Sequence, residues 1–390
     1  MNDHLRIEEK SLVDAGGIYT AREISRQPVI WKKTYDYLLR EKERITEFVN
    51  RSASDPSTQI ILTGAGSSAF IGNSLEGTMQ KNLEKIVRAV PATDLVSHPE
   101  LYLRKNIPTL MISFARSGDS PESAAAVHRA NSICSNIYHL IITCNPDGKL
   151  AKECHAERDL VFLLPPESND ESLAMTSSFS CMLLAGTLIT HINDLEKQKT
   201  YVDRLADYGH HMLEQYAPVI KEIAAMTFSR AVFLGSGPLK GIARESHLKL
   251  QELTDGKIIC KHDSYLGFRH GPRAVIDMTT LMVYLVTNNP EAISYEKDLI
   301  REIGRSEKGL YTLCVSENPL TDIESDNKII FSDAAGETLP EEYLAIANVL
   351  PAQCLGFYKS LDLGLRPDTP SADGTISRVV TGVTIYPFDQ

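Results

Sequence analysis

The sequence predicts an α/β protein built from two doubly wound parallel-sheet domains, with a helical arm at the N-terminus. Apolar runs of strand length alternate with helical segments along most of the 390 residues. The same alternation occurs twice, at an offset of roughly 171 to 173 residues. Turns rich in glycine and hydroxyl groups follow several strand runs, as is typical of the ligand-binding ends of parallel strands.

The two halves contain matching strand runs. Those of the first half are 59–63, 109–113, 138–143 and 160–164, and those of the second half are 231–234, 280–286, 310–315 and 328–332. The turn Gly-Ala-Gly-Ser at 64–67 corresponds to Gly-Ser-Gly-Pro at 235–238. We therefore expect a first domain over residues 51–200, a second over 201–365 and a tail over 366–390.

Residues 1–50 differ from both halves and predict the helical arm. The sequence Thr20-Ala21-Arg22-Glu23 matches a capping box, which indicates a helix start. The charged stretch 31–49 predicts one long helix, and Pro28 separates it from the preceding segment.

One loop of the first half has the features of a phosphate-binding loop. The strand run leads into Arg116, Ser117, Gly118 and Ser120, and Pro121 suits the first turn of a helix. Backbone N–H groups, two hydroxyls and the positive end of a helix dipole would meet at one point, which favours an anion. The alternative is an ordinary turn whose serines cap the helix.

Two further turns favour a small phosphorylated ligand. The turn that ends in Ser67 and Ser68 also matches the dinucleotide fingerprint, but that fingerprint expects an acidic residue after the next strand. The strand at 85–90 is basic instead, which argues against a dinucleotide. Thr176 and Ser177 form a third hydroxyl-rich turn before an apolar helix.

Composition excludes several functions. The net charge of −11 disfavours nucleic acid and anionic membrane surfaces as partners. No apolar run has membrane-spanning length and the N-terminus lacks the core of a signal peptide, so we expect a cytoplasmic protein. The seven cysteines contain no C-x-x-C pair and fit reduced, buried thiols, so we expect no metal site.

A helix of the second half has the residues for acid–base chemistry. It is expected to begin at Pro238 and end near Gly256. Glu245, Lys249 and Glu252 fall at i, i+4 and i+7, so one face carries two carboxylates with an ammonium between them. A solvated ion pair is the alternative, but the apolar residues of this helix form no single stripe, which indicates burial on more than one side.

The segment 261–273 that follows is interpreted as a loop rich in polar and aromatic residues. His270 lies in it and could exchange protons near neutral pH. The alternative is an exposed or structural histidine, the class in which we place His247 and His262.

These motifs resemble the AgaS family of galactosamine-6-phosphate deaminase/isomerases, which contain two sugar isomerase (SIS) domains. The resemblance rests on G-A-G-S-S at 64–68, S-x-A-R-S-G-x-S-P-E at 113–122, R-E-S-x-L-K-x-x-E-L-T at 244–254 and G-F-R-H-G-P at 267–272, and it extends over nearly the full length. It implies that the sugar and its phosphate are surrounded by Ser67, Ser68, Ser117, Ser120, Thr176 and Ser177.

The resemblance also implies roles for the second half. Glu252 matches the carboxylate that moves a proton between C2 and C1 of the sugar, and Lys249 would tune the charge around it. His270 matches a ring-opening histidine supplied by the neighbouring subunit, which implies a homodimer or a larger homo-oligomer. The C-terminal tail would close over the active site.

Two arginines stand at positions where the better understood relative, the isomerase half of glucosamine-6-phosphate synthase, has other residues. Arg116 stands in a phosphate loop that begins S-Q-S-G in the relative, so it either binds phosphate or points elsewhere. Arg378 stands in the tail, where the relative has a Schiff-base lysine. Because an arginine stays protonated, we expect Arg378 to bind substrate rather than to form an imine.

The expected function is an isomerising deaminase of amino-sugar catabolism, including that of N-acetylgalactosamine, with no cofactor and no metal. It would convert D-galactosamine 6-phosphate to D-tagatose 6-phosphate and ammonia. The alternatives are an aldose–ketose isomerase of a neutral sugar phosphate and a non-catalytic sugar-phosphate sensor. The choice between the galacto and gluco epimers stays open.

Overall fold

A computed structural model describes residues 3–155, 157–305, 309–332, 338–380 and 382–387. The chain forms two compact units, each with one five-stranded parallel sheet. The N-sheet unit comprises residues 29–170, 177–202 and 374–390, and the C-sheet unit comprises residues 1–28, 171–176 and 203–373. The predicted fold class, two parallel-sheet α/β domains with an N-terminal helical region, is confirmed.

The sheet of the N-sheet unit has the strand order β4-β3-β5-β6-β7. Its strands are β3 (Gln59–Thr63), β4 (Ile86–Ala89), β5 (Thr109–Ala115), β6 (Ile137–Thr143) and β7 (Asp159–Leu163). The chain runs from β3 outward to β4 and then returns to β5 on the other side of β3. The strand order therefore reverses between β3 and β5, where open α/β sheets bind their ligands.

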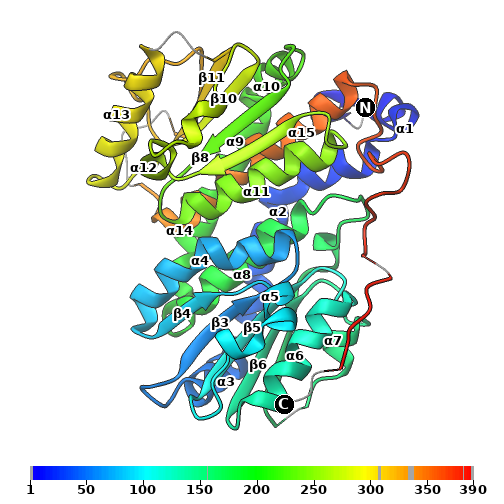
Figure 1. Ribbon diagram of the computed structural model, residues 1–390, viewed down its shortest axis with the longest axis vertical. Helices are drawn as coiled ribbons and strands as arrows, with labels where there is room; N and C mark the ends of the chain where they lie inside the picture. Colours follow the sequence, from blue (N-terminus) through cyan, green and yellow to red (C-terminus); the bar gives the residue numbers. More distant parts are fainter. Residues whose placement is uncertain (1–2, 156, 306–308, 333–337, 381, 388–390) are drawn as a thin grey trace. The chain divides into compact units, whose positions relative to one another are not determined.

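Helices cover both faces of this sheet (Figure 1). One face packs against α5 (Ala92–Ser97), α6 (Pro121–Ile133) and α7 (Lys149–Lys152), and the other against α4 (Ser67–Leu83) and α8 (Ser177–Thr190). Side chains of β5 alternate between the two faces, as the two-residue period of a strand requires. Met111 packs with Ile61 under α5 and α6, whereas Phe114 lies against Gly186 of α8.

The sheet of the C-sheet unit repeats this topology with the order β12-β11-β10-β8-β9. Its strands are β8 (Arg230–Leu234), β9 (Ile259–Asp263), β10 (Thr280–Leu285), β11 (Tyr311–Ser316) and β12 (Asn327–Ile330). Helices α12 (Tyr265–Phe268) and α13 (Ala292–Gly304) cover one face, and α11 (Pro238–Leu253) and α15 (Val349–Asp362) lie on the other (Figure 1).

The remaining elements connect and extend these layers. They are β1 (Asp3–His4), β2 (Ile7–Glu8), α1 (Glu9–Ala15), α2 (Ile18–Arg40), α3 (Lys42–Ser52), α9 (Lys199–Gln215), α10 (Ala217–Ala224) and α14 (Glu341–Ala347). Among the described residues, no helix combines the length and apolar character that a membrane crossing requires.

Three local predictions were wrong. Thr20 does not start a helix, because α2 begins at Ile18 and the Thr20 hydroxyl donates to Asp368 at 2.7 Å. Pro28 does not separate two helices: α2 runs through it to Arg40, and buried contacts such as the Trp31 indole N–H bond to Ser180 Oγ (2.9 Å) offset the lost backbone bond. The stretch 31–49 is not one helix either, because α2 ends at Arg40 and α3 begins at Lys42.

The segment 261–273 is not a loop throughout. Its first three residues complete β9, the edge strand that pairs with β8, and residues 265–268 form α12. The polar composition of β9 concealed it, because an edge strand has one neighbour and its side chains are only half-buried.

Candidate functional site

The first two hydroxyl-rich turns lie at the carboxyl ends of β3 and β5, on either side of the reversal point of the N-sheet unit. Ser67 and Ser68 are the first two residues of α4 and are buried. Gly64 lets the turn fold tightly onto this helix, since a Cβ there would lie 2.6 Å from Ser68 Cβ. The predicted placement of both serines at a helix start is confirmed.

The loop 116–120 after β5 is held in shape by the turn between β6 and α7. Asn145 Nδ2 donates to the Ser117 carbonyl at 2.9 Å, and the Lys149 N–H donates to Asp119 Oδ1 at 2.9 Å. Gly148 touches the same loop, because a Cβ on it would lie 2.3 Å from the Ser117 carbonyl oxygen. The loop is therefore supported from behind by a second loop of the same sheet edge.

Ser120 does not act as an ordinary helix cap. It occupies the N-cap position of α6, but its side chain caps no backbone N–H of the helix. Its hydroxyl instead shares a 2.7 Å hydrogen bond with Ser123 Oγ. The alternative interpretation of this turn, in which serine hydroxyls cap the helix, is not what the structure shows for Ser120.

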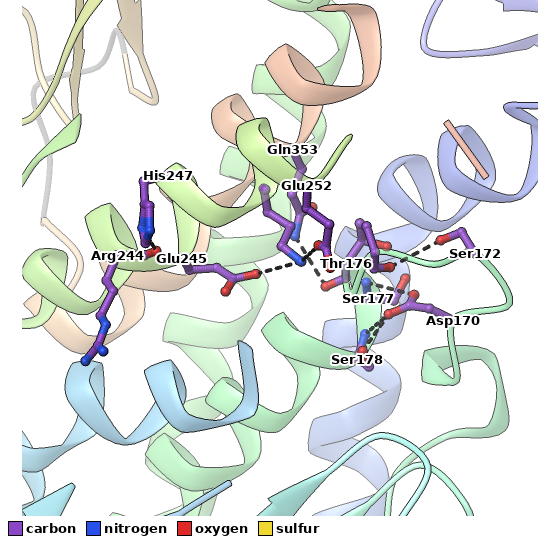
Figure 2. Close-up of polar contacts among 12 residues, drawn as sticks. Asp170, Ser172, Thr176, Ser177, Ser178, Arg244, Glu245, His247, Glu252 and Gln353 are labelled. Carbon is purple, nitrogen blue, oxygen red and sulfur yellow. Dashed lines mark hydrogen bonds and ion pairs between the residues drawn. The ribbon is translucent and has the colours of Figure 1, made fainter. Parts of the chain in front are cut away.

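The third turn differs, because a buried carboxylate occupies the N-terminus of α8. Asp170 is completely buried and accepts hydrogen bonds from the Ser177 N–H (3.0 Å), the Ser178 N–H (2.9 Å) and Ser178 Oγ (2.5 Å) (Figure 2). These N–H groups are committed to Asp170, so we expect Thr176 and Ser177 to contribute hydroxyls rather than a free helix N-terminus.

The capping role of Asp170 was not predicted from the sequence. A capping residue normally lies two or three positions before the N–H groups it binds, whereas Asp170 precedes Ser177 by seven. Glu23 was predicted only as part of a capping box. It is buried and instead accepts the Glu171 N–H at 2.5 Å and the Ser172 N–H at 3.2 Å, from a segment far along the chain. No local sequence signal indicates these partners.

Both predicted arginine ligands contact protein groups of the N-sheet unit. Arg116 is buried, and its Nη2 donates to the Arg378 carbonyl at 2.5 Å. The Arg378 guanidinium donates to the Asp170 carbonyl from Nε (2.9 Å) and Nη2 (2.6 Å), and Nη2 also donates to Asn169 Oδ1 (3.0 Å). The C-terminal tail is thus tied to two of the three hydroxyl-rich turns.

The three charged residues of α11 form one row in the C-sheet unit, as predicted. Lys249 Nζ lies 3.4 Å from Glu245 Oε1 and 2.6 Å from Glu252 Oε2. The side chains of Glu245 and Lys249 are 0% and 1% exposed, whereas that of Glu252 is 21% exposed. The solvated-pair alternative is therefore wrong, and within this row Glu252 is the group that reaches solvent. Figure 2 shows Glu245 and Glu252 on the same helix.

Close packing fixes the position of this row. Gly356 of α15 sits directly on α11, where an added Cβ would lie 3.0 Å from the Lys249 carbonyl oxygen and 2.8 Å from Leu253 Cδ1. The absence of a side chain at Gly356 lets the two helices approach closely. The backbone that carries Lys249 and Glu252 is consequently held by a neighbouring helix.

The predicted histidines divide into two kinds. His270 is exposed on the turn after α12, and the neighbouring Arg269 and Arg273 both bind Glu302. His247 and His262 stack with ring centroids 4.6 Å apart. Burial lowers the pKa of both, that of His262 to about 4, so the stacked pair is neutral at neutral pH.

Within the part of the chain that the structure describes, no group of three or more histidine, cysteine or carboxylate side chains is arranged to hold a metal ion. The cysteines are free thiols, and burial raises the pKa of Cys144 to about 12. Such a thiol is a poor nucleophile at neutral pH.

The SIS domain family model matches residues 55–192, which include the sheet of the N-sheet unit, so this part of the chain is an SIS domain. The chain belongs more specifically to the AgaS family. The D-galactosamine-6-phosphate deaminase AgaS of Shewanella is 40% identical to it over 392 residues, which cover 99% of this chain and 96% of the relative.

Two solved structures agree with this assignment. A provisionally named tagatose-6-phosphate ketose/aldose isomerase from Clostridium novyi has 41% identity and a TM-score of 0.96, with all of both chains covered. The tagatose-6-phosphate ketose/aldose isomerase from Escherichia coli has 32% identity and a TM-score of 0.89, and the match covers 98% of this chain and 99% of that one.

Proposed function

We propose that this protein is an isomerising deaminase that converts D-galactosamine 6-phosphate to D-tagatose 6-phosphate and ammonia. The names of its AgaS relatives support the substrate and the deamination. The observation that carries the chemistry is the buried row on α11, in which Glu252 alone reaches solvent. A carboxylate held in one position by an ammonium and accessible from outside is suited to move a proton.

The substrate's phosphate is bound in this proposal by the hydroxyl-rich turns. Ser67, Ser68, Ser117 and Ser120 lie at the reversal point of the sheet, and Thr176 and Ser177 belong to the third turn. Arg116 supplies positive charge beside Ser117. Uncharged hydroxyl donors together with a cation suit a phosphate monoester.

The reaction begins with the open-chain amino sugar, which has an aldehyde at C1 and an amine at C2. Glu252 removes the C2 proton to give an enolamine and returns a proton to C1, which yields an imine at C2. Water adds to the imine and ammonia leaves, which gives the 2-ketose 6-phosphate. Each step is a proton transfer or a hydrolysis, so the proposal includes neither a metal nor a redox cofactor.

Lys249 and His270 have supporting roles in the proposal. Lys249 bridges Glu245 and Glu252, so it holds the base in place and places a positive charge beside it. His270 opens the sugar ring, and its exposed position favours action on a neighbouring subunit of a homodimer or larger homo-oligomer. The acidic composition and the free thiols favour a cytoplasmic place of action in amino-sugar catabolism.

The deciding experiment measures two products from several substrates. Purified protein is incubated with galactosamine 6-phosphate, glucosamine 6-phosphate and galactose 6-phosphate, which has no amine. Ammonia and ketose are quantified in parallel. We expect equal amounts of ammonia and ketose from galactosamine 6-phosphate. Interconversion of the neutral sugar phosphate without ammonia from either amino sugar would establish the simple isomerase instead. Binding without turnover would indicate a sensor.

A further inference from the structure

We propose that Arg378 is a positioning residue that locks the C-terminal tail onto the phosphate-binding turns, rather than a ligand of the phosphate. This inference rests on the proposed function, because it concerns the site where the sugar phosphate is expected to bind. All the groups involved belong to the N-sheet unit.

The guanidinium of Arg378 donates hydrogen bonds to two consecutive residues, Asn169 and Asp170. It makes three hydrogen bonds, two to the Asp170 carbonyl (2.9 and 2.6 Å) and one to Asn169 Oδ1 (3.0 Å). An arginine has five N–H donors in a rigid planar fork, so these bonds also determine the orientation of the group. Hydrogen bonds from a charged donor are about twice as strong as neutral ones.

Asp170 transmits this constraint to the third turn. Its backbone carbonyl binds Arg378, while its completely buried carboxylate binds the N–H groups of Ser177 and Ser178. A shift of the Asp170 backbone would therefore strain or break the cap of α8. Arg378 thus acts on Ser177 through Asp170 without touching it.

The backbone of Arg378 completes the connection to the loop after β5. Its carbonyl accepts a 2.5 Å hydrogen bond from Nη2 of the buried Arg116, which directly precedes Ser117. One tail residue therefore links two of the three phosphate-binding turns. Holding binding groups in place before the ligand arrives lowers the entropy cost of binding, so this link should strengthen substrate affinity.

The test measures amide hydrogen exchange in the substrate-free protein. We expect Arg378→Ala to speed exchange of the Ser177 and Ser178 N–H groups by at least about tenfold, because their carboxylate cap loses its anchor. We also expect the KM for galactosamine 6-phosphate to rise roughly tenfold with kcat changed less than about threefold. Arg378→Lys keeps the charge but not the planar fork, so it should behave like the alanine variant.

Arg129→Ala is the matched control. Arg129 Nη2 donates to the Tyr386 carbonyl at 2.7 Å, so this variant loosens the tail without touching Asp170. Exchange at Ser177 and Ser178 should then match the wild type, as should KM.

Unchanged exchange at both serines in Arg378→Ala would overturn the inference. Wild-type affinity in Arg378→Lys together with weak affinity in Arg378→Ala would do the same, since charge alone would then suffice, as for a direct phosphate ligand. The proposed function fails separately, if the wild type releases no ammonia. Faster exchange in Arg378→Ala would still establish the positioning role in that case.

Discussion

At the scale of the residue, Glu245 and Glu252 show how exposure separates two chemically identical groups. Both carboxylates lie against the same ammonium of Lys249, one on each side along α11. Only the side chain of Glu252 has access to solvent within this row. This difference supports the proposal that Glu252 transfers the proton and that Glu245 has a supporting role.

Glu252→Gln tests this assignment. The amide keeps the size of the side chain but accepts no proton, so we expect turnover of galactosamine 6-phosphate to fall roughly 100-fold or more. Glu245→Gln removes the same charge from the buried end of the row, and it should lower turnover distinctly less than Glu252→Gln does. Circular dichroism and the urea midpoint check that both variants fold. Near-normal turnover in Glu252→Gln would exclude it as the base.

Lys249→Met tests the energetics of the same row. Removing the ammonium breaks the buried ion pair of Lys249 with Glu245, and breaking a buried pair from one side costs about 3–5 kcal/mol. We expect the urea midpoint to fall accordingly. The double variant E245Q/K249M should recover part of this loss, because no buried charge then remains at position 245. Equal stability of Lys249→Met and the wild type would show that the pair does not stabilise the fold.

At the scale of the element, the turn between β6 and α7 supports the loop 116–120, which is proposed to bind the phosphate. Gly148 has φ −62°, which any residue adopts, so its tolerance of a side chain depends on space alone. A Cβ there would meet the Ser117 carbonyl oxygen at 2.3 Å. The loop must move to admit it.

Gly148→Ala should therefore weaken substrate binding. We expect the KM for galactosamine 6-phosphate to rise roughly tenfold, because displacement of Ser117 disturbs the phosphate site, with a stability loss of about 1–3 kcal/mol. Gly77→Ala in α4 is the matched control, because apart from its chain neighbours and the nearby backbone of its own helix no atom lies within 4 Å of the added Cβ. That variant should keep the wild-type KM, and its free energy of unfolding should rise by up to about 1 kcal/mol. Equal KM values in the two variants would contradict the view that the turn between β6 and α7 holds the loop 116–120 in place.

At the scale of the whole molecule, the two units share a topology but differ in the chemistry of their ligand edges. The N-sheet unit carries hydroxyls after β3 and β5. In the C-sheet unit, Thr287 lies two positions after the end of β10 and is bound by two glutamates. Its N–H donates to Glu296 at 2.8 Å, and its hydroxyl donates to Glu341. The duplicated edge therefore carries carboxyl groups bound to Thr287, where the N-sheet unit carries serine hydroxyls.

Glu296 also makes a pH-dependent contribution to stability. It is completely buried, and burial raises its pKa from 4.5 to about 7. The unfolded chain loses this proton near pH 4.5, whereas the folded protein keeps it to about pH 7. The folded state therefore binds more protons between these values, so the contribution of Glu296 is complete below pH 4.5 and is lost as pH rises to 7.

Glu296→Gln should remove this dependence, because a glutamine imitates the protonated acid and still accepts the Thr287 N–H. Relative to the wild type, we expect the variant to be similar in stability at pH 4 and more stable by about 3 kcal/mol at pH 8. Urea unfolding at the two pH values measures the difference. A difference that does not grow with pH would contradict the shifted pKa.

Local patterns predicted most of the fold, and the exceptions have identifiable causes. Buried runs such as 59–63 and 109–113 marked central strands, because such strands are apolar on both faces. The edge strand β9 lacked that signal. Thr20 and Pro28 misled local reasoning, because tertiary contacts to Asp368 and Ser180 outweighed the capping and proline preferences.

The sequence by itself determined the duplicated α/β architecture, the row of charges on α11 and the hydroxyl-rich turns. Each of these depends on residues close together in the chain, where helix and strand periods dictate which side chains share a face. Only the tertiary structure decided that Glu252 is the solvent-accessible member of its row, that Asp170 caps α8 and that Arg378 binds beside Asp170. Burial and long-range hydrogen bonds depend on segments far apart in sequence, such as Arg378 and Asp170, which are 208 residues apart, and no local pattern encodes them.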